Sequence, residues 1–220
     1  MMKMHHRDKK ENEQNKNNAR IGIMGGVFDP IHIGHLFTAE EARINYDLDK
    51  VIFVPCLNPT HKRNGQVTDV KHRLKMSYLA TDNNPYFEVS KIEINRSGPS
   101  YTIDTIREFR NIYGWDTGIF FITGADAFLE IETWYKKEEL LKMCQFVAAT
   151  RPGYDLNKLH QNFKEVLKIM EIPLLAISST DIRNRIRNGL SIRYIVLEGV
   201  REYIYKHKLY SSKRLENIGK

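Results

Sequence analysis

The chain has little cysteine and no long apolar segment. Two of its 220 residues are cysteine, Cys56 and Cys144, and they do not form a Cys-x-x-Cys pair. This scarcity argues against a disulfide framework or a zinc site and suits a reducing compartment. No apolar run approaches the ~20 residues of a membrane-spanning helix, and no apolar stretch follows the basic N-terminus as in a secretory signal. We therefore expect a cytoplasmic protein that has no membrane partner.

The net charge of +7 belongs to the two ends of the chain. Residues 1–20 hold six Lys or Arg and three Asp or Glu, and residues 201–220 hold six and two, which leaves 22 of each sign between them. Basic ends are usually solvated tails, so we expect no nucleic-acid partner. Residues 1–19 have almost no apolar content beyond methionine and are predicted to be a disordered tail. Residues 20–210 are predicted to form one domain, and residues 211–220 a C-terminal tail.

Short apolar runs alternate with longer amphipathic stretches along the predicted domain. The runs predict strands buried on both faces, at Ile21–Met24, Val51–Pro55, Phe87–Val89, Ile119–Thr123, Phe146–Thr150 and Leu174–Ile177. The stretches predict helices at Leu36–Tyr46, Asp69–Ala80, Thr102–Tyr113, Asn157–Met170, Ser179–Asn188 and Val196–Lys206. This alternation predicts an α/β fold with a Rossmann-like, doubly wound parallel sheet, in which ligands bind at the carboxyl ends of the strands.

The first motif reads Gly-Gly-Val-Phe-Asp-Pro-Ile-His-Ile-Gly-His and runs from Gly25 to His35, between a predicted strand and a predicted helix. Gly25 and Gly26 lack a Cβ, so the backbone can approach a ligand closely. His32 and His35 flank the helix start, where free N–H groups and the helix dipole favour an anion. Histidines at this spacing are often plain surface residues, and we find no further ligands that would complete a zinc site.

The second motif reads Ile-Ser-Ser-Thr-Asp-Ile-Arg and follows the last predicted strand. Ser178, Ser179 and Thr180 are natural N-cap residues, and a helix N-terminus rich in hydroxyls is a second phosphate site. Arg183 lies one turn into the helix, where its planar fork could reach an oxyanion. Taken alone, this motif is more typical of a plain capped helix with a solvated arginine.

The two motifs, in this order, resemble those of the nucleotidyltransferase superfamily with a His-x-Gly-His signature. Within it, the chain is similar to the bacterial nicotinate-nucleotide adenylyltransferases over roughly residues 20–210. Further segments that carry this resemblance are Pro99–Thr105, Phe121–Phe128, Trp134–Lys136, Arg151–Tyr154, Val200–Ile204 and Leu209–Tyr210. The resemblance implies transfer of AMP from ATP to nicotinate mononucleotide, with Mg²⁺ accompanying ATP. The products are nicotinate adenine dinucleotide and pyrophosphate, in a step of NAD biosynthesis.

The resemblance also implies a role for individual residues, with no metal ligand among them. The residues implied at the reacting phosphates are His32, His35 and Arg183. Those implied to bind ATP are Gly25, Gly26, Val27, Phe28, Gly124, Asp126, Ser178, Ser179 and Thr180. Those implied to bind the mononucleotide are Lys62, Thr102, Trp134 and Tyr135. On local grounds, Asp126 could instead cap a helix, Trp134 could be a core residue, and Lys62 could be an ordinary exposed lysine.

Two positions depart from the family pattern. Thr60 stands where the family usually has the second proline of Pro-Pro-His-Lys, and Glu198 stands where it often has proline. The alternatives within the same chemistry are an enzyme for nicotinamide mononucleotide and a phosphopantetheine adenylyltransferase, which usually has threonine at the position of His32. A nucleotide- or RNA-binding protein is an alternative of another class. The letters His-Ile-Gly-His also match the signature of class I aminoacyl-tRNA synthetases, and Lys75-Met76-Ser77 resembles the start of their second motif. This alternative fits least, because Lys75-Met76-Ser77 lies mid-helix and lacks the Lys-Ser that should follow it. The sequence leaves homo-oligomer formation open.

Overall fold

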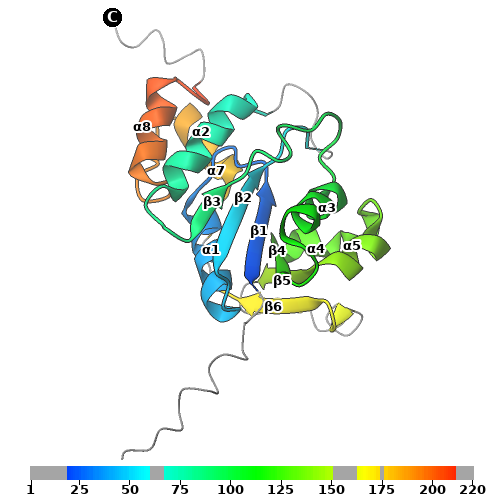
Figure 1. Cartoon of the computed structure of the whole chain (residues 1–220). Helices are drawn as coiled ribbons and strands as arrows, with labels where there is room; N and C mark the ends of the chain where they lie inside the picture. Colours follow the sequence, from blue (N-terminus) through cyan, green and yellow to red (C-terminus); the bar gives the residue numbers. More distant parts are fainter. Residues whose placement is uncertain (1–18, 60–66, 151–162, 174–175, 212–220) are drawn as a thin grey trace, which may run out of the picture.

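The computed structural model describes residues 19–59, 67–150, 163–173 and 176–211 (Figure 1). The predicted tails lie outside these residues except for Ala19 and Ser211. Lys62 and the Thr60 departure also lie outside them. Across the described residues, no helix has the length and apolar character needed to cross a membrane.

The described strands form one parallel sheet in the order β3-β2-β1-β4-β5-β6. The strands are β1 (Arg20–Gly26), β2 (Lys50–Pro55), β3 (Phe87–Val89), β4 (Gly118–Gly124), β5 (Gln145–Thr150) and β6 (Leu167–Glu171). The order reverses between β1 and β4, so the Rossmann-like, doubly wound α/β fold predicted from the sequence is confirmed. The five predicted strands from β1 to β5 are confirmed, with bounds that differ by no more than two residues.

The described helices follow or precede these strands. They are α1 (Ile33–Asn45), α2 (Val70–Thr81), α3 (Thr102–Tyr113), α4 (Ala125–Leu129), the 3₁₀ turn η1 (Ile131–Thr133), α5 (Lys137–Met143), α7 (Ser179–Arg187) and α8 (Glu198–Lys206). Glu198, one of the two departures, begins α8 and forms an ion pair with Arg201 one turn later. The elements α4, η1 and α5 are too short for the periodicity that predicted the longer helices.

The sixth strand was predicted in the wrong place. Leu167–Glu171 forms β6, whereas the sequence predicted a helix through Met170 and a strand at Leu174–Ile177. Leu167 and Met170 are the buried residues of β6, and their spacing of three equally suits a helix. The hydrogen-bonded ladder with β5 decides the outcome. Leu174 and Leu175 lie outside the described residues, and the two residues that follow them are not in a strand.

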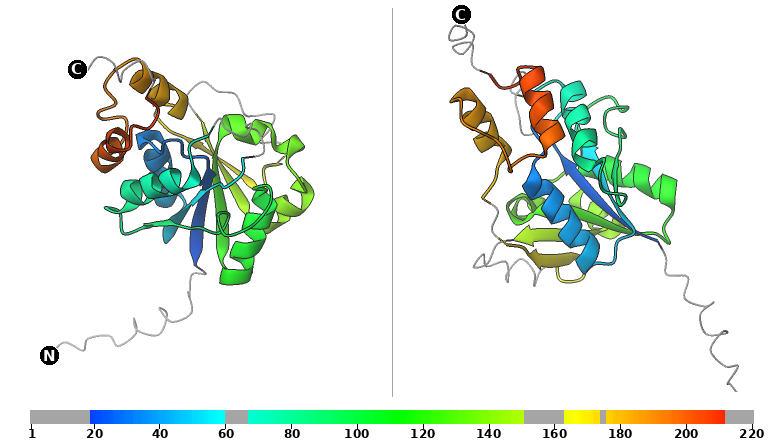
Figure 2. Two further views of the ribbon diagram at one scale, coloured as in Figure 1. Left: turned by 90° about the horizontal axis from the view of Figure 1, so that it is seen from above. Right: turned by 90° about the vertical axis from the view of Figure 1, so that its left-hand side faces the viewer.

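Two apolar layers enclose the sheet. On one face, α1, α2, α7 and α8 pack on side chains such as Met24 and Phe53. On the other face, α3, α4 and α5 pack on side chains such as Ile23 and Phe121 (Figure 1 and Figure 2). Because successive side chains of a strand point to opposite faces, burial on both faces leaves only the strand ends free for a ligand.

We predict that Gly22→Ala destabilises the protein, because a methyl group at this position requires the buried side chains of Ile122, Leu48 and Val51 to shift within the core. A Cβ on Gly22 would lie 2.9 Å from Ile122 Cδ1 and 2.9 Å from Leu48 Cδ1. Overpacking of this kind costs about 1–3 kcal/mol of unfolding free energy, which urea denaturation measures. Gly199→Ala is the matched control, since its Cβ would meet Leu79 at an ordinary 3.8 Å and alanine favours a helix. Equal stability of the two variants would contradict this packing account.

Candidate active site

A cavity of about 560 Å³ opens at the carboxyl ends of β1, β4 and β5. It is lined by residues of both sequence motifs and by the ends of β4 and β5. The lining includes seven of the residues predicted from the sequence: Gly25, His32, His35, Gly124, Asp126, Ser178 and Ser179. The fold therefore brings the two motifs to one crevice, as the topology predicts.

The two histidines of the first motif form a stacked pair at the start of α1. His32 is the N-cap residue, with extended backbone, and its ring lies over that of His35 with 3.7 Å between centroids. The backbone N–H of His32 donates to Nδ1 of His35 at 3.2 Å. A Cβ on Gly34 would lie 3.0 Å from Nδ1 of His32, so glycine between the histidines leaves room for the stack. This packing explains the His-x-Gly-His spacing.

Both histidines are held in the neutral form. Burial lowers the pKa of His32 to about 4. Burial, followed by the neighbouring His32, lowers the pKa of His35 well below its usual range. Because Nδ1 of His35 accepts a hydrogen bond, we assign the proton of the neutral ring to Nε2, which then is a donor. Nδ1 of His32 is buried and has no hydrogen-bond partner among the described residues.

The start of α7 is hydrogen-bonded to the first motif. The Ser179 hydroxyl donates to the Pro30 carbonyl at 2.9 Å, and Arg183 Nη1 donates to the Asp29 carbonyl at 2.8 Å. Ser178 is the N-cap, and its Oγ accepts from the backbone N–H of Asp181 at 3.0 Å. The structure thus places the N-termini of α1 and α7 at the same cavity, where their free N–H groups favour an anion.

Arg183 and Thr180 belong to this junction but do not line the cavity. Arg183 Nη2 donates to the Thr180 hydroxyl at 3.1 Å, so two of the arginine's nitrogens are engaged by the protein. The described lining contains no Arg or Lys side chain. Its polar groups are imidazoles, hydroxyls, backbone groups and one carboxylate, that of Asp126.

A buried arginine supports the first motif. Arg73 in α2 is 1% exposed; its Nε donates to the Thr68 carbonyl at 2.8 Å, and its Nη1 donates to the Val27 carbonyl at 2.7 Å. The sequence analysis missed Arg73, although its place among the apolar positions of the predicted helix Asp69–Ala80 was a signal. An arginine on the buried face of a helix requires partners that satisfy it.

Phe28 is a core residue rather than a lining residue. Its ring is 2% exposed and meets the ring of His35 edge-on at 5.1 Å. A Cβ on Gly26 would lie 2.8 Å from the Phe28 ring, so the second glycine of the motif makes room for this packing. The φ of Phe28 is 49°, a left-handed conformation that is uncommon for an aromatic residue. Gly26, Val27 and Phe28 are not among the lining residues.

Three of the four residues predicted for the mononucleotide lie within the described residues, at the start of α3 and directly after η1. Thr102 is the first residue of α3. The ring centroids of Tyr101, the residue before it, and of Tyr135 are 4.6 Å apart. Trp134 is half-buried and meets Phe121 edge-on at 6.0 Å, so its ring is partly a core contact, as the alternative held. None of the three predicted residues is in the described lining, and their roles stay predictions.

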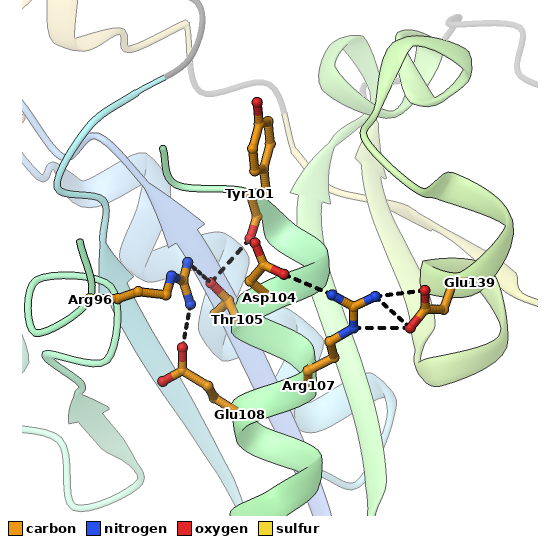
Figure 3. A network of polar contacts seen from close by, with 7 residues as sticks. All are labelled: Arg96, Tyr101, Asp104, Thr105, Arg107, Glu108 and Glu139. Carbon is orange, nitrogen blue, oxygen red and sulfur yellow. Dashed lines mark hydrogen bonds and ion pairs between the residues drawn. The ribbon is translucent and has the colours of Figure 1, made fainter. Parts of the chain in front are cut away.

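A polar network fixes the start of α3 relative to α5 (Figure 3). Arg107 forms ion pairs with Asp104 on its own helix at 2.9 Å and with Glu139 on α5 at 2.6 Å. Arg96 bonds Glu108 at 2.5 Å and the Thr105 hydroxyl at 3.3 Å. The ion pair between Arg107 and Glu139 links α3, which begins at Thr102, to α5, which follows the segment that carries Trp134 and Tyr135.

The described residues contain no group of three or more His, Cys, Asp or Glu side chains that could hold a metal ion. Mg²⁺ commonly binds through substrate phosphates and one or two carboxylates, with water completing its coordination. Asp126 is the carboxylate that lines the cavity, so the described site suits Mg²⁺ that accompanies a nucleotide.

Comparison of the sequence with known proteins identifies the family of this chain. The model of the cytidylyltransferase-like family matches residues 23–185. A protein of Thermoanaerobacter sp. (strain X514), named probable nicotinate-nucleotide adenylyltransferase, is 58% identical over 198 residues, which cover 87% of this chain and 94% of that protein. A protein of Moorella thermoacetica with the same name is 53% identical over 207 residues, which cover 91% of this chain and 95% of that protein. The chain belongs to the nicotinate-nucleotide adenylyltransferase family.

The resemblance found in the sequence is thereby confirmed. Among solved structures, Plasmodium falciparum nicotinic acid mononucleotide adenylyltransferase complexed with NaAD matches with a TM-score of 0.74. That match covers 88% of this chain and 98% of the other at 20% identity. The same enzyme complexed with APC matches with a TM-score of 0.73 at 21% identity. At these identities the two structures show the shared fold of the family.

Because the pKa of His32 is lowered in the folded protein, we predict that the unfolding free energy decreases as the pH falls. In the unfolded chain an ordinary histidine binds its proton near pH 6.5, whereas folded His32 binds it only near pH 4. Stability from neutral His32 is therefore complete above pH 6.5 and is lost as the pH falls toward 4. Between pH 7 and pH 5, wild type should lose roughly 1–2 kcal/mol more unfolding free energy than His32→Asn in urea titrations. Parallel losses in the two proteins would contradict the assignment.

Proposed function

We propose that the protein transfers AMP from ATP to nicotinate mononucleotide, giving nicotinate adenine dinucleotide and pyrophosphate, in a step of NAD biosynthesis. The observation that carries the proposal is the junction of the two motifs: two helix N-termini and a stacked histidine pair face one cavity. Phosphate groups bind well at such positions. The names of the two relatives described above supply the substrate class.

In this proposal, ATP binds with its base in the apolar part of the cavity and its phosphates in the polar part. The apolar part of the lining is formed by Ile122, Ala149, Ile172, Pro173 and Ile177, which suit a flat base. The polar part is formed by the histidine pair and the start of α7, which suit phosphates. Gly124, at the end of β4, also lines the cavity, and an added Cβ there would meet nothing within 4 Å. The backbone at this point is therefore open to a ligand.

The remaining ATP contacts follow from this placement. Gly25 lines the cavity, where its backbone can approach the nucleotide, while Gly26, Val27 and Phe28 shape the loop behind it. Asp126 is placed to meet the ribose or a magnesium ion, and Thr180 contributes to the hydroxyl-rich start of α7. Bound Mg²⁺ would neutralise charge on the pyrophosphate that leaves.

The reaction is an in-line displacement at the α-phosphorus of ATP. A phosphate oxygen of the mononucleotide forms the new P–O bond, and the bond between the α-phosphorus and the bridging oxygen breaks, so that pyrophosphate leaves. The attacking phosphate is already ionised near neutral pH, so no general base is required. Neutral His32 and His35 donate hydrogen bonds to the α-phosphate oxygens, where charge develops. Ser178, Ser179 and the N–H groups of α7, with Arg183, hold the leaving pyrophosphate.

The mononucleotide binds on the side of α3. The aromatic ring of Trp134 offers a stacking surface for pyridine, and the hydroxyl of Thr102 with nearby backbone N–H groups offers donors for its carboxylate. Tyr135 is 49% exposed beside them, and Lys62 is proposed at the mononucleotide phosphate. Both cysteines are buried, which suits a reducing compartment, so we also propose a cytoplasmic location.

We predict that His35→Ala lowers kcat by about 10²–10³-fold, because a donor that stabilises transition-state charge is lost. Pyrophosphate release from ATP and Mg²⁺ with nicotinate mononucleotide measures the rate, and circular dichroism checks that the variant remains folded. A folded His35→Ala protein that keeps most of its kcat would remove His35 from the mechanism.

We predict that the enzyme prefers nicotinate mononucleotide to nicotinamide mononucleotide, and that Thr102→Val weakens this preference. Pyrophosphate release with the two mononucleotides side by side measures it. Thr117→Val, beyond the far end of α3, is the control, since the Thr117 hydroxyl donates to the Tyr113 carbonyl away from the cavity. Equal or reversed preference in the wild-type enzyme would overturn the assignment of nicotinate mononucleotide as the substrate, while adenylyl transfer from ATP would remain supported. No release with either mononucleotide would contradict the proposed activity itself.

A further inference from the structure

The C-terminal part of the described chain reaches back to the first motif. Tyr210 lies four residues beyond α8, and its hydroxyl lies 2.7 Å from Oδ1 of Asp29, across a separation of 181 residues. Asp29 is 2% exposed, whereas Tyr210 is half-buried beside the apolar layer that α8 covers. No role in the proposed reaction has been given to Tyr210.

The phenol is the donor in this contact. Burial, then the nearby Asp29 carboxylate, raises the pKa of Tyr210, so the hydroxyl keeps its proton. The other carboxylate oxygen, Oδ2, accepts the backbone N–H of Thr68 at 3.2 Å. Each oxygen of this buried carboxylate therefore has a donor, and loss of one donor would leave an oxygen unsatisfied, which is costly.

Asp29 is also the residue whose backbone meets Arg183. Its carbonyl accepts Arg183 Nη1 at 2.8 Å, and the next carbonyl, that of Pro30, accepts the Ser179 hydroxyl at 2.9 Å. The side chain of Asp29 is thus fixed by the C-terminal segment, while its backbone fixes the arginine assigned to the leaving pyrophosphate.

We propose that Tyr210 is a positioning residue for adenylyl transfer: its hydroxyl fixes Asp29 and, through the Asp29 carbonyl, the placement of Arg183. This role rests on the proposed function, and it assigns the C-terminal segment to the junction between the two motifs. A displacement of a charged group by a fraction of an ångström is enough to lower the rate of a reaction that depends on positioning.

The test uses the full chain with Tyr210→Phe, which keeps the ring and removes the hydroxyl. Tyr203→Phe is the matched control, because the Tyr203 hydroxyl on α8 lies 2.9 Å from Nδ1 of His72, away from the first motif. We expect Tyr210→Phe to lower the midpoint of urea unfolding more than Tyr203→Phe does, because it leaves Oδ1 of the buried Asp29 carboxylate without its donor. Both variants should remain folded in the absence of urea, where kcat is measured. Tyr210→Phe alone should lower kcat, by about five- to tenfold, with the KM for the mononucleotide unchanged within about twofold. Wild-type kcat in Tyr210→Phe would overturn the proposal.

A double variant separates positioning from a general loss of structure. If Tyr210 acts through Arg183, Tyr210→Phe should cause no further loss of kcat in an Arg183→Ala background. Losses that multiply in the double variant would show that the two residues act independently, and the proposal would be wrong.

Amide hydrogen exchange supplies a readout besides activity. The Thr68 amide, which donates to Asp29, and the amides of residues 27–29 should exchange faster in Tyr210→Phe than in wild type or Tyr203→Phe. Unchanged exchange would contradict the contact on which the proposal depends. A wild-type protein that releases no pyrophosphate would contradict the proposed function instead, and exchange would still decide whether Tyr210 holds Asp29.

Discussion

The hydrogen bonds between the start of α7 and the loop after β1 are the contacts on which the rest of the site depends. Ser179 and Arg183 donate to the carbonyls of Pro30 and Asp29, across separations of 149 and 154 residues. They bring the N-termini of α1 and α7 together. Without this junction, the two helix N-termini would not face one cavity and could not act on the same nucleotide.

Apart from the Asp126 carboxylate, the described lining of the cavity offers neutral groups to an anionic substrate. This described lining has imidazoles, hydroxyls and backbone groups in place of Arg or Lys, and burial keeps both histidines uncharged. Fixed dipoles of this kind stabilise developing charge without the desolvation cost that a buried cation carries. The positive charge of the junction comes from Arg183 and Arg73, which hold the loop by its carbonyls. The arginines thus hold the loop after β1 in place by its carbonyls, while the neutral lining groups remain available to phosphates.

The sequence predicted most of the fold and those parts of the site that are continuous in the chain. Alternating apolar runs and helical patterns located β1 to β5, because buried parallel strands have a clear signature. That signature fails for β6 at the sheet edge, where Leu167 and Met170 fit a helix equally well. The motifs located His32, His35 and the start of α7. The contact of Tyr210 was missed because its partner Asp29 lies 181 residues away, which no residue pattern reveals. The carbonyl partner of Arg73 is equally invisible in the sequence, although the position of Arg73 on the buried face of its helix was a signal.

In the proposed complex, ATP lies in the cavity with its α-phosphate at the histidine pair and its β- and γ-phosphates at the start of α7. A crystal structure of the protein with a non-hydrolysable ATP analogue and Mg²⁺ tests it most directly. The account predicts α-phosphate oxygens within hydrogen-bonding distance of a ring nitrogen of His32 or His35, and the base among Ile122, Ile172 and Ile177. A base stacked at the histidine pair, or phosphates bound outside the cavity, would contradict it.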